Sequence, residues 1–106
     1  MSGKFILAST AEKQELDWGT FVWISRPAAT GSRNLAVCYV EIAPGKGHNF
    51  HKHPDQDEVI HVIEGTMEQW LEREKKTLNP RDSVFIPRGT VHASFNTGSS
   101  TLRVIA

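Results

Sequence analysis

The stretch that decides the fold runs from residue 45 to residue 65 and reads GKGHNFHKHPDQDEVIHVIEG. It contains a His-Lys-His triplet, then a turn-forming Pro-Asp-Gln-Asp, then an apolar run. Side chains alternate along a β-strand, so His51 and His53 point to one face about 7 Å apart. Two imidazoles that lean toward a shared point can take adjacent positions around one metal ion. The stretch therefore predicts a strand that carries two metal ligands.

Two further candidate ligands, Glu58 and His92, come from outside this strand. Glu58 follows His53 at an odd offset, which would put it on the opposite face of an unbroken strand. The turn composition of residues 54–57 can reset the chain direction and return Glu58 to the same cavity. His92 follows the turn at 87–89 and would reach in from a distant hairpin. Three imidazoles and one carboxylate suit a first-row ion, and we expect one divalent transition metal per chain, whether Mn, Fe, Ni, Co or Zn.

The rest of the chain reads as short strands separated by turns. Val, Ile, Thr, Phe and Trp dominate the candidate strands, while Pro, Gly, Asn and Asp stand between them. Only residues 9–17 could be helical, with Ser9 and Glu12 as a weak capping box. Many short strands at this spacing predict an all-β sandwich or barrel. We expect strands at residues 20–24, 35–42, 50–53, 58–64, 66–71, 76–78, 83–86, 92–95 and 102–105.

Composition narrows the possible partners. Lys and Arg together number 12, as do Asp and Glu, so the formal net charge is zero. No basic excess steers the chain to nucleic acid or to an anionic membrane, and no apolar run is long enough for a signal peptide or a membrane span. The only cysteine, Cys38, allows no intrachain disulfide, which fits a reducing cytosol, and we expect a cytoplasmic protein. Cys38 itself is predicted to be a small buried hydrophobe.

Two motifs in this sequence resemble those of the cupin superfamily, and of its small single-domain members with the type 2 conserved barrel. The first, G-x5-H-x-H-x4-E-x6-G, fits residues 45–65 at every spacing, and P-x-G-x2-H-x3-N fits the body of the second within residues 81–96. The resemblance implies one cupin domain over residues 1–106, folded as a double-stranded β-helix, or jelly roll, with a metal ion in the barrel mouth. The family's four ligands map onto His51, His53, Glu58 and His92.

One residue departs from the second motif. Arg81 stands where that motif usually opens with glycine. We expect Pro80 and Arg81 to occupy the centre of a type I turn, which needs no positive φ. The departure therefore concerns the turn and leaves the metal ligands intact.

The two remaining histidines are predicted to avoid the metal. His48 is offset by three from His51, and His61 by three from Glu58, so both fall off the ligand face of a regular strand. We expect them in solvent or on the outside of a sheet. Asn49 has the parity of His51, and it either lines the mouth or makes a hydrogen bond at the end of a loop.

Three more polar or aromatic positions depend on local geometry. Asn96 precedes Thr97-Gly98-Ser99-Ser100, so a turn-forming role is favoured over support of a metal ligand. Either Gln69 or Trp70 should face inward, and the choice stays open because the turn near residues 65–66 can carry a bulge. The charged run at 72–76 reads as a solvated hairpin tip. Trp18, Phe21, Trp23 and Phe50 are predicted to be core or dimer-interface aromatics.

Two classes of function fit these features. In an octahedral ion four protein ligands leave two positions open, so the first is a metal-dependent enzyme such as a dioxygenase, an isomerase or a sugar-processing protein. The second is a non-catalytic module that binds a small molecule or sugar, as sensor cupins do; 106 residues leave no room for an output domain, which favours the enzyme. The sequence shows no inward pair of Lys or Arg side chains, which disfavours strongly anionic substrates. Exposed apolar edge strands near Trp18 predict a homodimer.

Overall fold

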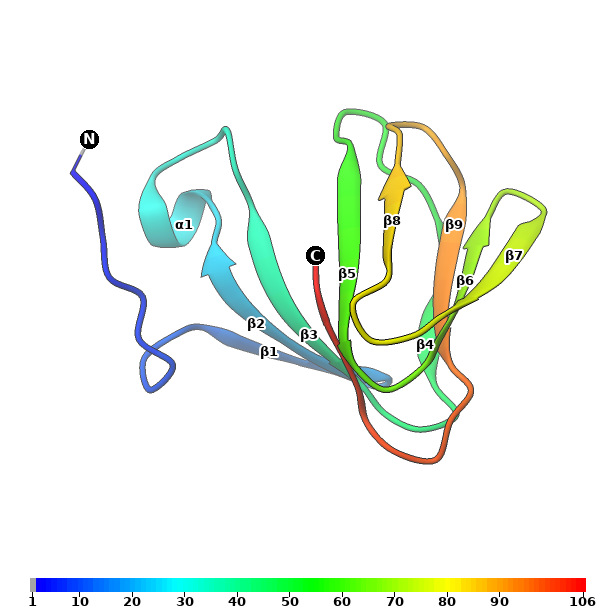
Figure 1. The fold of residues 1–106 in the computed structure, drawn as a ribbon. Helices are drawn as coiled ribbons and strands as arrows, with labels where there is room; N and C mark the ends of the chain where they lie inside the picture. The colour runs from blue at the N-terminus through cyan, green and yellow to red at the C-terminus, as the bar shows by residue number, and fades with distance from the viewer. Residues whose placement is uncertain (1) are drawn as a thin grey trace.

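Two antiparallel β-sheets face one another in a computed structural model that describes residues 2–106 (Figure 1). One sheet has six strands in the order β1-β2-β3-β10-β5-β8, and the other has four in the order β4-β9-β6-β7. The elements are β1 (Lys13–Leu16), β2 (Gly19–Ser25), α1 (Pro27–Thr30), β3 (Val37–Ile42), β4 (Gly47–His51), β5 (Glu58–Glu64), β6 (Met67–Leu71), β7 (Glu74–Leu78), β8 (Ser83–Ile86), β9 (His92–Asn96) and β10 (Leu102–Ile105). The predicted all-β jelly roll is confirmed.

Alternating side chains build the core between the sheets. In β3, Cys38, Val40 and Ile42 are buried, while the residues between them are partly exposed. Met67 of the four-stranded sheet is fully buried in the same cluster, so the two sheets share one core. Burial raises the pKa of the Cys38 thiol to about 11, and this residue is the buried small hydrophobe that the sequence predicted.

The aromatic residues of the N-terminal half divide between two surfaces. Trp18, Phe21 and Trp23 are partly buried and pack against the shared core. Phe50 instead lies on the outer face of the four-stranded sheet, 47% exposed, with its ring 5.7 Å from that of Trp70 and 6.1 Å from that of Phe95.

Two expectations about local structure are wrong. Residues 9–17 form no helix; a turn at 8–10 leads into β1, which pairs with β2 because that pairing satisfies its backbone groups. The one short helix instead begins at Pro27, and Gly31 ends it in a left-handed conformation. Strand β4 covers residues 47–51 rather than 50–53, so His53 lies beyond its end.

The turn before β8 differs from the expected type I turn. Arg81 has a φ of 78°, and the Asp82 amide donates to the Asn79 carbonyl at 2.9 Å. Pro80 followed by a residue at positive φ is a type II turn, which explains why glycine suits this position of the motif. The Asp82 carboxylate accepts the Asn79 amide at 2.8 Å, and the Arg81 amide donates to Val62, so hydrogen bonds on both sides hold the strained residue.

No helix among residues 2–106 is long and apolar enough to cross a membrane.

Candidate metal centre

The four predicted ligands converge at one end of the barrel. His51 ends β4 and lies directly opposite His92, the first residue of β9. Glu58 begins β5 in the other sheet, and His53 lies in the connection between the sheets. One nitrogen or oxygen atom from each residue lies within 4.8 Å of the other three, so the cluster could hold a metal ion.

The connection at 52–57 explains how an odd offset still brings Glu58 to the site. It crosses from the four-stranded to the six-stranded sheet, which is the change of direction that the turn composition predicted. The Gly89 amide donates to the His53 carbonyl at 2.8 Å, and the Arg88 amide donates to the Asp57 carboxylate at 2.9 Å. The hydrogen bond from the Arg88 backbone amide lowers the pKa of the Asp57 carboxyl below its ordinary value. The loop before β9 therefore fixes the loop that carries His53.

Two backbone carbonyls set the proton positions on the imidazoles. His51 Nδ1 lies 2.6 Å from the Asn49 carbonyl oxygen, and His92 Nδ1 lies 2.9 Å from that of Thr90. A carbonyl oxygen can only accept, so each Nδ1 carries the proton and donates it. In the neutral ring the Nε2 lone pair is then free, and this is the form that binds a metal ion. Burial lowers the pKa of His51, which favours this neutral form.

The strongest indication of a cation site comes from one atom each of Glu58 and His92. Glu58 Oε1 and His92 Nε2 are buried, and within the described chain neither has a hydrogen-bond partner. They lie 3.1 Å apart, and Glu58 Oε1 lies 3.6 Å from His53 Nε2. In the neutral His92 ring with its proton on Nδ1, Nε2 and the carboxylate oxygen are both acceptors and repel each other at this distance. A divalent cation between them would satisfy both, so these residues fit a metal ion.

His48 does not lie where strand parity predicted. The register of β4 against β9 shifts between His48 and His51, so a β-bulge puts both on the inner face. The His48 ring stacks on the His51 ring with centroids 3.8 Å apart and planes 20° apart. Burial, followed by the nearby histidines, lowers the pKa of His48 to about 4. His61 is on the outer face as predicted, with Nδ1 2.7 Å from Ser83 Oγ.

The bulge also decides the role of Asn49. Its side chain is exposed, and its Oδ1 accepts the amide of Phe50 at 2.8 Å. Asn49 therefore does not line the mouth, and its side-chain hydrogen bond lies within the bulged strand β4 rather than at the end of a loop. The Asn49 carbonyl adds a function that the sequence did not suggest, because it fixes the tautomer of His51.

The inner face of the four-stranded sheet is a polar strip beside the four predicted ligands. Gln69 rather than Trp70 faces inward, 3% exposed, and its Oε1 accepts the hydroxyl of Ser94 at 2.6 Å. At the far end of the strip Asn96 is 2% exposed and accepts the Gly98 amide at 3.0 Å, which confirms its turn-forming role. These buried polar groups are paired, as interior polar groups must be.

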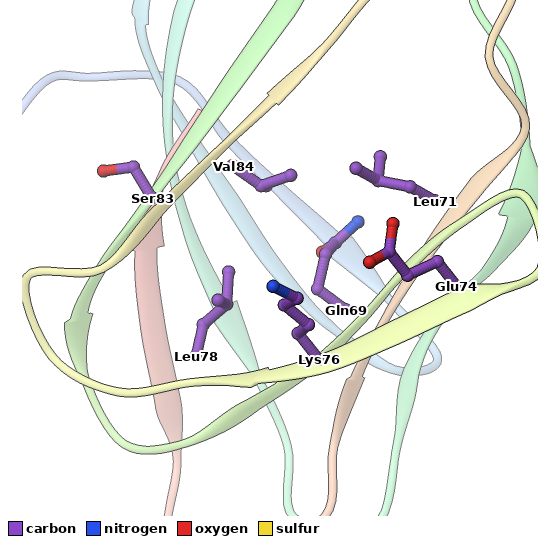
Figure 2. Close-up of a pocket in the computed structure, with 7 residues that line it drawn as sticks. All are labelled: Gln69, Leu71, Glu74, Lys76, Leu78, Ser83 and Val84. Carbon is purple, nitrogen blue, oxygen red and sulfur yellow. The ribbon is translucent and has the colours of Figure 1, made fainter.

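A cavity of about 210 Å³ lies between the edge strands β7 and β8 (Figure 2). Its wall combines apolar side chains with polar ones, namely Gln69, Leu71, Glu74, Lys76, Leu78, Ser83 and Val84. Glu74 and Lys76 are exposed, as expected for this hairpin. The Glu74 carboxylate points toward Gln69 in Figure 2, while the Ser83 hydroxyl points away. Leu71 lies directly opposite His92 in the neighbouring strand, so the cavity begins beside the cluster of predicted ligands.

Comparisons with known proteins agree with this geometry. The model of the cupin domain family matches residues 38–106. The polyketide synthase protein TcmJ of Streptomyces glaucescens, which is named for tetracenomycin, is 26% identical over 104 residues, 98% of this chain and 69% of that protein. Germin-like protein 3-8 of Oryza sativa subsp. japonica is 32% identical over 76 residues, 67% of this chain and 34% of that protein, so the chain spans about a third of this relative.

Solved structures show the same fold. KdgF from Halomonas sp. superposes with a TM-score of 0.83 at 22% identity, covering 98% of this chain and 91% of that one. An RmlC-like cupin from Shewanella frigidimarina superposes with a TM-score of 0.83 at 18% identity, covering 98% of this chain and 87% of that one. A predicted oxalate decarboxylase from Thermotoga maritima superposes with a TM-score of 0.84 at 16% identity, covering 96% of this chain and 95% of that one.

Proposed function

Because this chain belongs to the cupin family, we propose that His51, His53, Glu58 and His92 bind one divalent transition metal ion, and that a small organic molecule binds beside it in the barrel. The observation that carries the proposal is the pair of buried acceptors, Glu58 Oε1 and His92 Nε2, which face each other 3.1 Å apart. Three imidazoles and one carboxylate suit Mn, Fe, Ni, Co or Zn.

The proposed activity is that of a metal-dependent oxygenase or isomerase. A metal ion bound there would supply Lewis acidity or a binding position for dioxygen. The chain itself supplies four ligands from the described residues, and His48, His61, Asp55 and Asp57 are not among them. The carbonyls of Asn49 and Thr90 keep two Nε2 atoms unprotonated and aimed at the cluster.

The cavity beside the cluster supports the binding of a small substrate. Leu71, Leu78 and Val84 offer apolar contact, and Lys76 and Glu74 add one charge of each sign. A molecule of modest size with an apolar body and polar substituents suits this lining. Lys76 would attract a carboxylate, and Glu74 would accept a hydroxyl proton in a hydrogen bond. We therefore extend the proposed substrates to include small hydroxycarboxylates.

Exchangeable metal positions test the enzyme proposal. The iron(II)-loaded protein is expected to bind nitric oxide and give the half-integer-spin resonance signal of an iron–nitrosyl adduct, because four protein ligands leave cis positions open. A small hydroxycarboxylate should shift the visible spectrum of the cobalt(II)-loaded protein. The His92→Ala chain, treated identically, is the control and should give neither signal. If the wild-type metal spectrum responds to neither probe, the site is closed and the metal is structural.

A further experiment is needed to distinguish an enzyme from a protein that only binds its ligand. A sensor that only binds its ligand would also pass both spectroscopic tests. A screened substrate must therefore be turned over by the wild-type chain, with turnover lost in Glu58→Ala. Ligand binding without any turnover would favour the non-catalytic binding module.

We also propose that the chain forms a homodimer. Trp18, which motivated this expectation, packs with its aromatic neighbours against the chain's own core. Exposed apolar residues on the outer face of the six-stranded sheet support the proposal instead, since Val59 and Phe85 pair directly there and are 53% and 57% exposed. Light scattering during gel filtration should give a dimer mass at tens of micromolar. Phe85→Lys should lower that mass, whereas Phe5→Lys, at a position 98% exposed, should not. A monomer mass for the wild type would refute the proposal.

A further inference from the structure

Three aromatic rings are stacked from the N-terminal hairpin to the metal cluster. The rings of Trp18 and His48 are 4.7 Å apart with planes 19° apart, and those of His48 and His51 are 3.8 Å apart with planes 20° apart. Phe21 approaches His48 edge-on at 6.5 Å and Trp18 at 5.4 Å. His48 is therefore enclosed between a tryptophan and a predicted metal ligand.

The backbone on both sides is built to hold this stack. The bulge in β4 turns His48 inward and sends Phe50 to the outer face. Gly47 permits the approach of β4 to β9, because a Cβ there would lie 2.6 Å from the Ser94 carbonyl oxygen. The Trp18 carbonyl accepts the Ala43 amide at 3.0 Å, which ties the β1–β2 turn to the end of β3. The rings thus meet through fixed backbone positions.

His51 is held less firmly by burial than His92, the other strand-borne imidazole of the cluster. His92 is 1% exposed and is fixed by burial, whereas His51 is more exposed and ends a strand. Its Nδ1 bond to Asn49 fixes one edge of the ring, but a single hydrogen bond leaves the ring free to tilt about that edge. The His48 ring lies against the face of His51 and removes this freedom. With edge and face both held, the direction of Nε2 is fixed.

We infer that His48 and Trp18 are positioning residues for the ligand His51, so that the N-terminal hairpin forms part of the metal centre. This inference rests on the proposed metal binding. His48 presents its ring face to His51, and it is not among the residues whose donor atoms converge within 4.8 Å. Its contribution comes from the flat ring rather than from a nitrogen. A second effect adds to this, because a metal-bound imidazole is electron-poor and stacks favourably on electron-rich rings.

The experiment separates the contribution of the flat His48 ring from that of its nitrogen atoms. Zinc affinity is measured by competition with a chelator, and ligand geometry by the visible spectrum of the cobalt(II) form. His48→Ala should weaken zinc binding about tenfold, the scale of effects from residues that orient a ligand, and should change the cobalt spectrum. His48→Phe keeps a flat ring and should restore both affinity and spectrum. His61→Ala, which removes a histidine from the outer face, is the matched control and should leave both unchanged.

Several results would overturn the inference. If His48→Phe loses as much affinity as His48→Ala, a nitrogen of His48 is required and the stack is not the cause. If His48→Ala binds zinc as the wild type does, the stack does not position His51. Should His48→Ala fail to fold, Trp18→Leu and Trp18→Phe repeat the comparison, with the leucine variant alone expected to lose affinity. A wild-type chain that binds no zinc would overturn the metal proposal together with this one, whereas an unaffected His48→Ala would overturn only this one.

Discussion

His92→Ala is expected to abolish stoichiometric metal binding, while the wild-type chain purified without chelator carries close to one first-row metal ion. The imidazole is 1% exposed, and its Nε2 lies 3.1 Å from Glu58 Oε1, a buried oxygen that has no hydrogen-bond partner among residues 2–106. Replacing ligand-supporting residues costs about ten- to a hundredfold in metal affinity, and loss of a ligand itself should exceed that range. Elemental analysis and chelator competition measure the effect.

His51→Ala and His53→Ala should behave in the same way, because both rings belong to the same cluster. His61→Gln is the control, since it also removes an imidazole but from the outer face of the six-stranded sheet. Full metal occupancy at wild-type affinity in His51→Ala or His92→Ala would refute the ligand assignment. A large loss in His61→Gln would show that the assay reports folding rather than ligation.

Asn96→Ala is expected to cause the largest loss of stability among polar substitutions. The side chain is 2% exposed, and its Nδ2 donates to the carbonyls of Ile42 at 2.9 Å and Ser100 at 2.8 Å. Alanine leaves these two acceptors and the Gly98 amide without their partner. We expect a loss of about 3 kcal/mol in the free energy of unfolding of the metal-free protein, since each unsatisfied buried group costs about 1–3 kcal/mol. For a chain of this size the loss corresponds to a fall in Tm on the order of 15 °C.

Two variants define the origin of that effect. Asn96→Asp keeps the acceptor for the Gly98 amide and loses both donations, so it should also be strongly destabilised. Thr97→Ala changes the exposed neighbouring residue and should stay within about 0.5 kcal/mol of the wild type. Thermal and denaturant unfolding followed by circular dichroism measure both. An Asn96→Ala variant as stable as Thr97→Ala would show that these hydrogen bonds contribute nothing.

Sequence alone predicted the parts of the fold in which local signals agree. Strands β5, β8 and β10 have the expected bounds because apolar residues alternate between turn residues. Strand β1, with the sequence Lys-Gln-Glu-Leu, has no such alternation. It is a strand because β2 offers it hydrogen-bonding partners, and pairing of that kind is not visible in its own residues.

At the site, the motif spacing identified the cluster, and parity misplaced His48. The prediction from strand alternation assumes that every residue of β4 pairs with one residue of β9. The bulge between His48 and His51 adds one residue, which reverses the side of everything before it. The sign of φ at Arg81 was missed for a related reason. The Val62 carbonyl accepts the Arg81 amide and the Asp82 carboxylate accepts the Asn79 amide, and these hydrogen bonds select the turn type.

The position of β10 has a consequence for the order of folding. Strands β3 and β5 do not pair with each other, and β10 lies between them and bonds to both. During synthesis the chain emerges from its N-terminus, so the six-stranded sheet exists as two separate pieces until residues 102–105 have left the ribosome. Joining these pieces requires contacts between residues far apart in sequence, which makes this closing step intrinsically slow. Until it occurs, Val62 and Val104 lack each other as neighbours, and the nascent barrel exposes an apolar seam that a chaperone could cover.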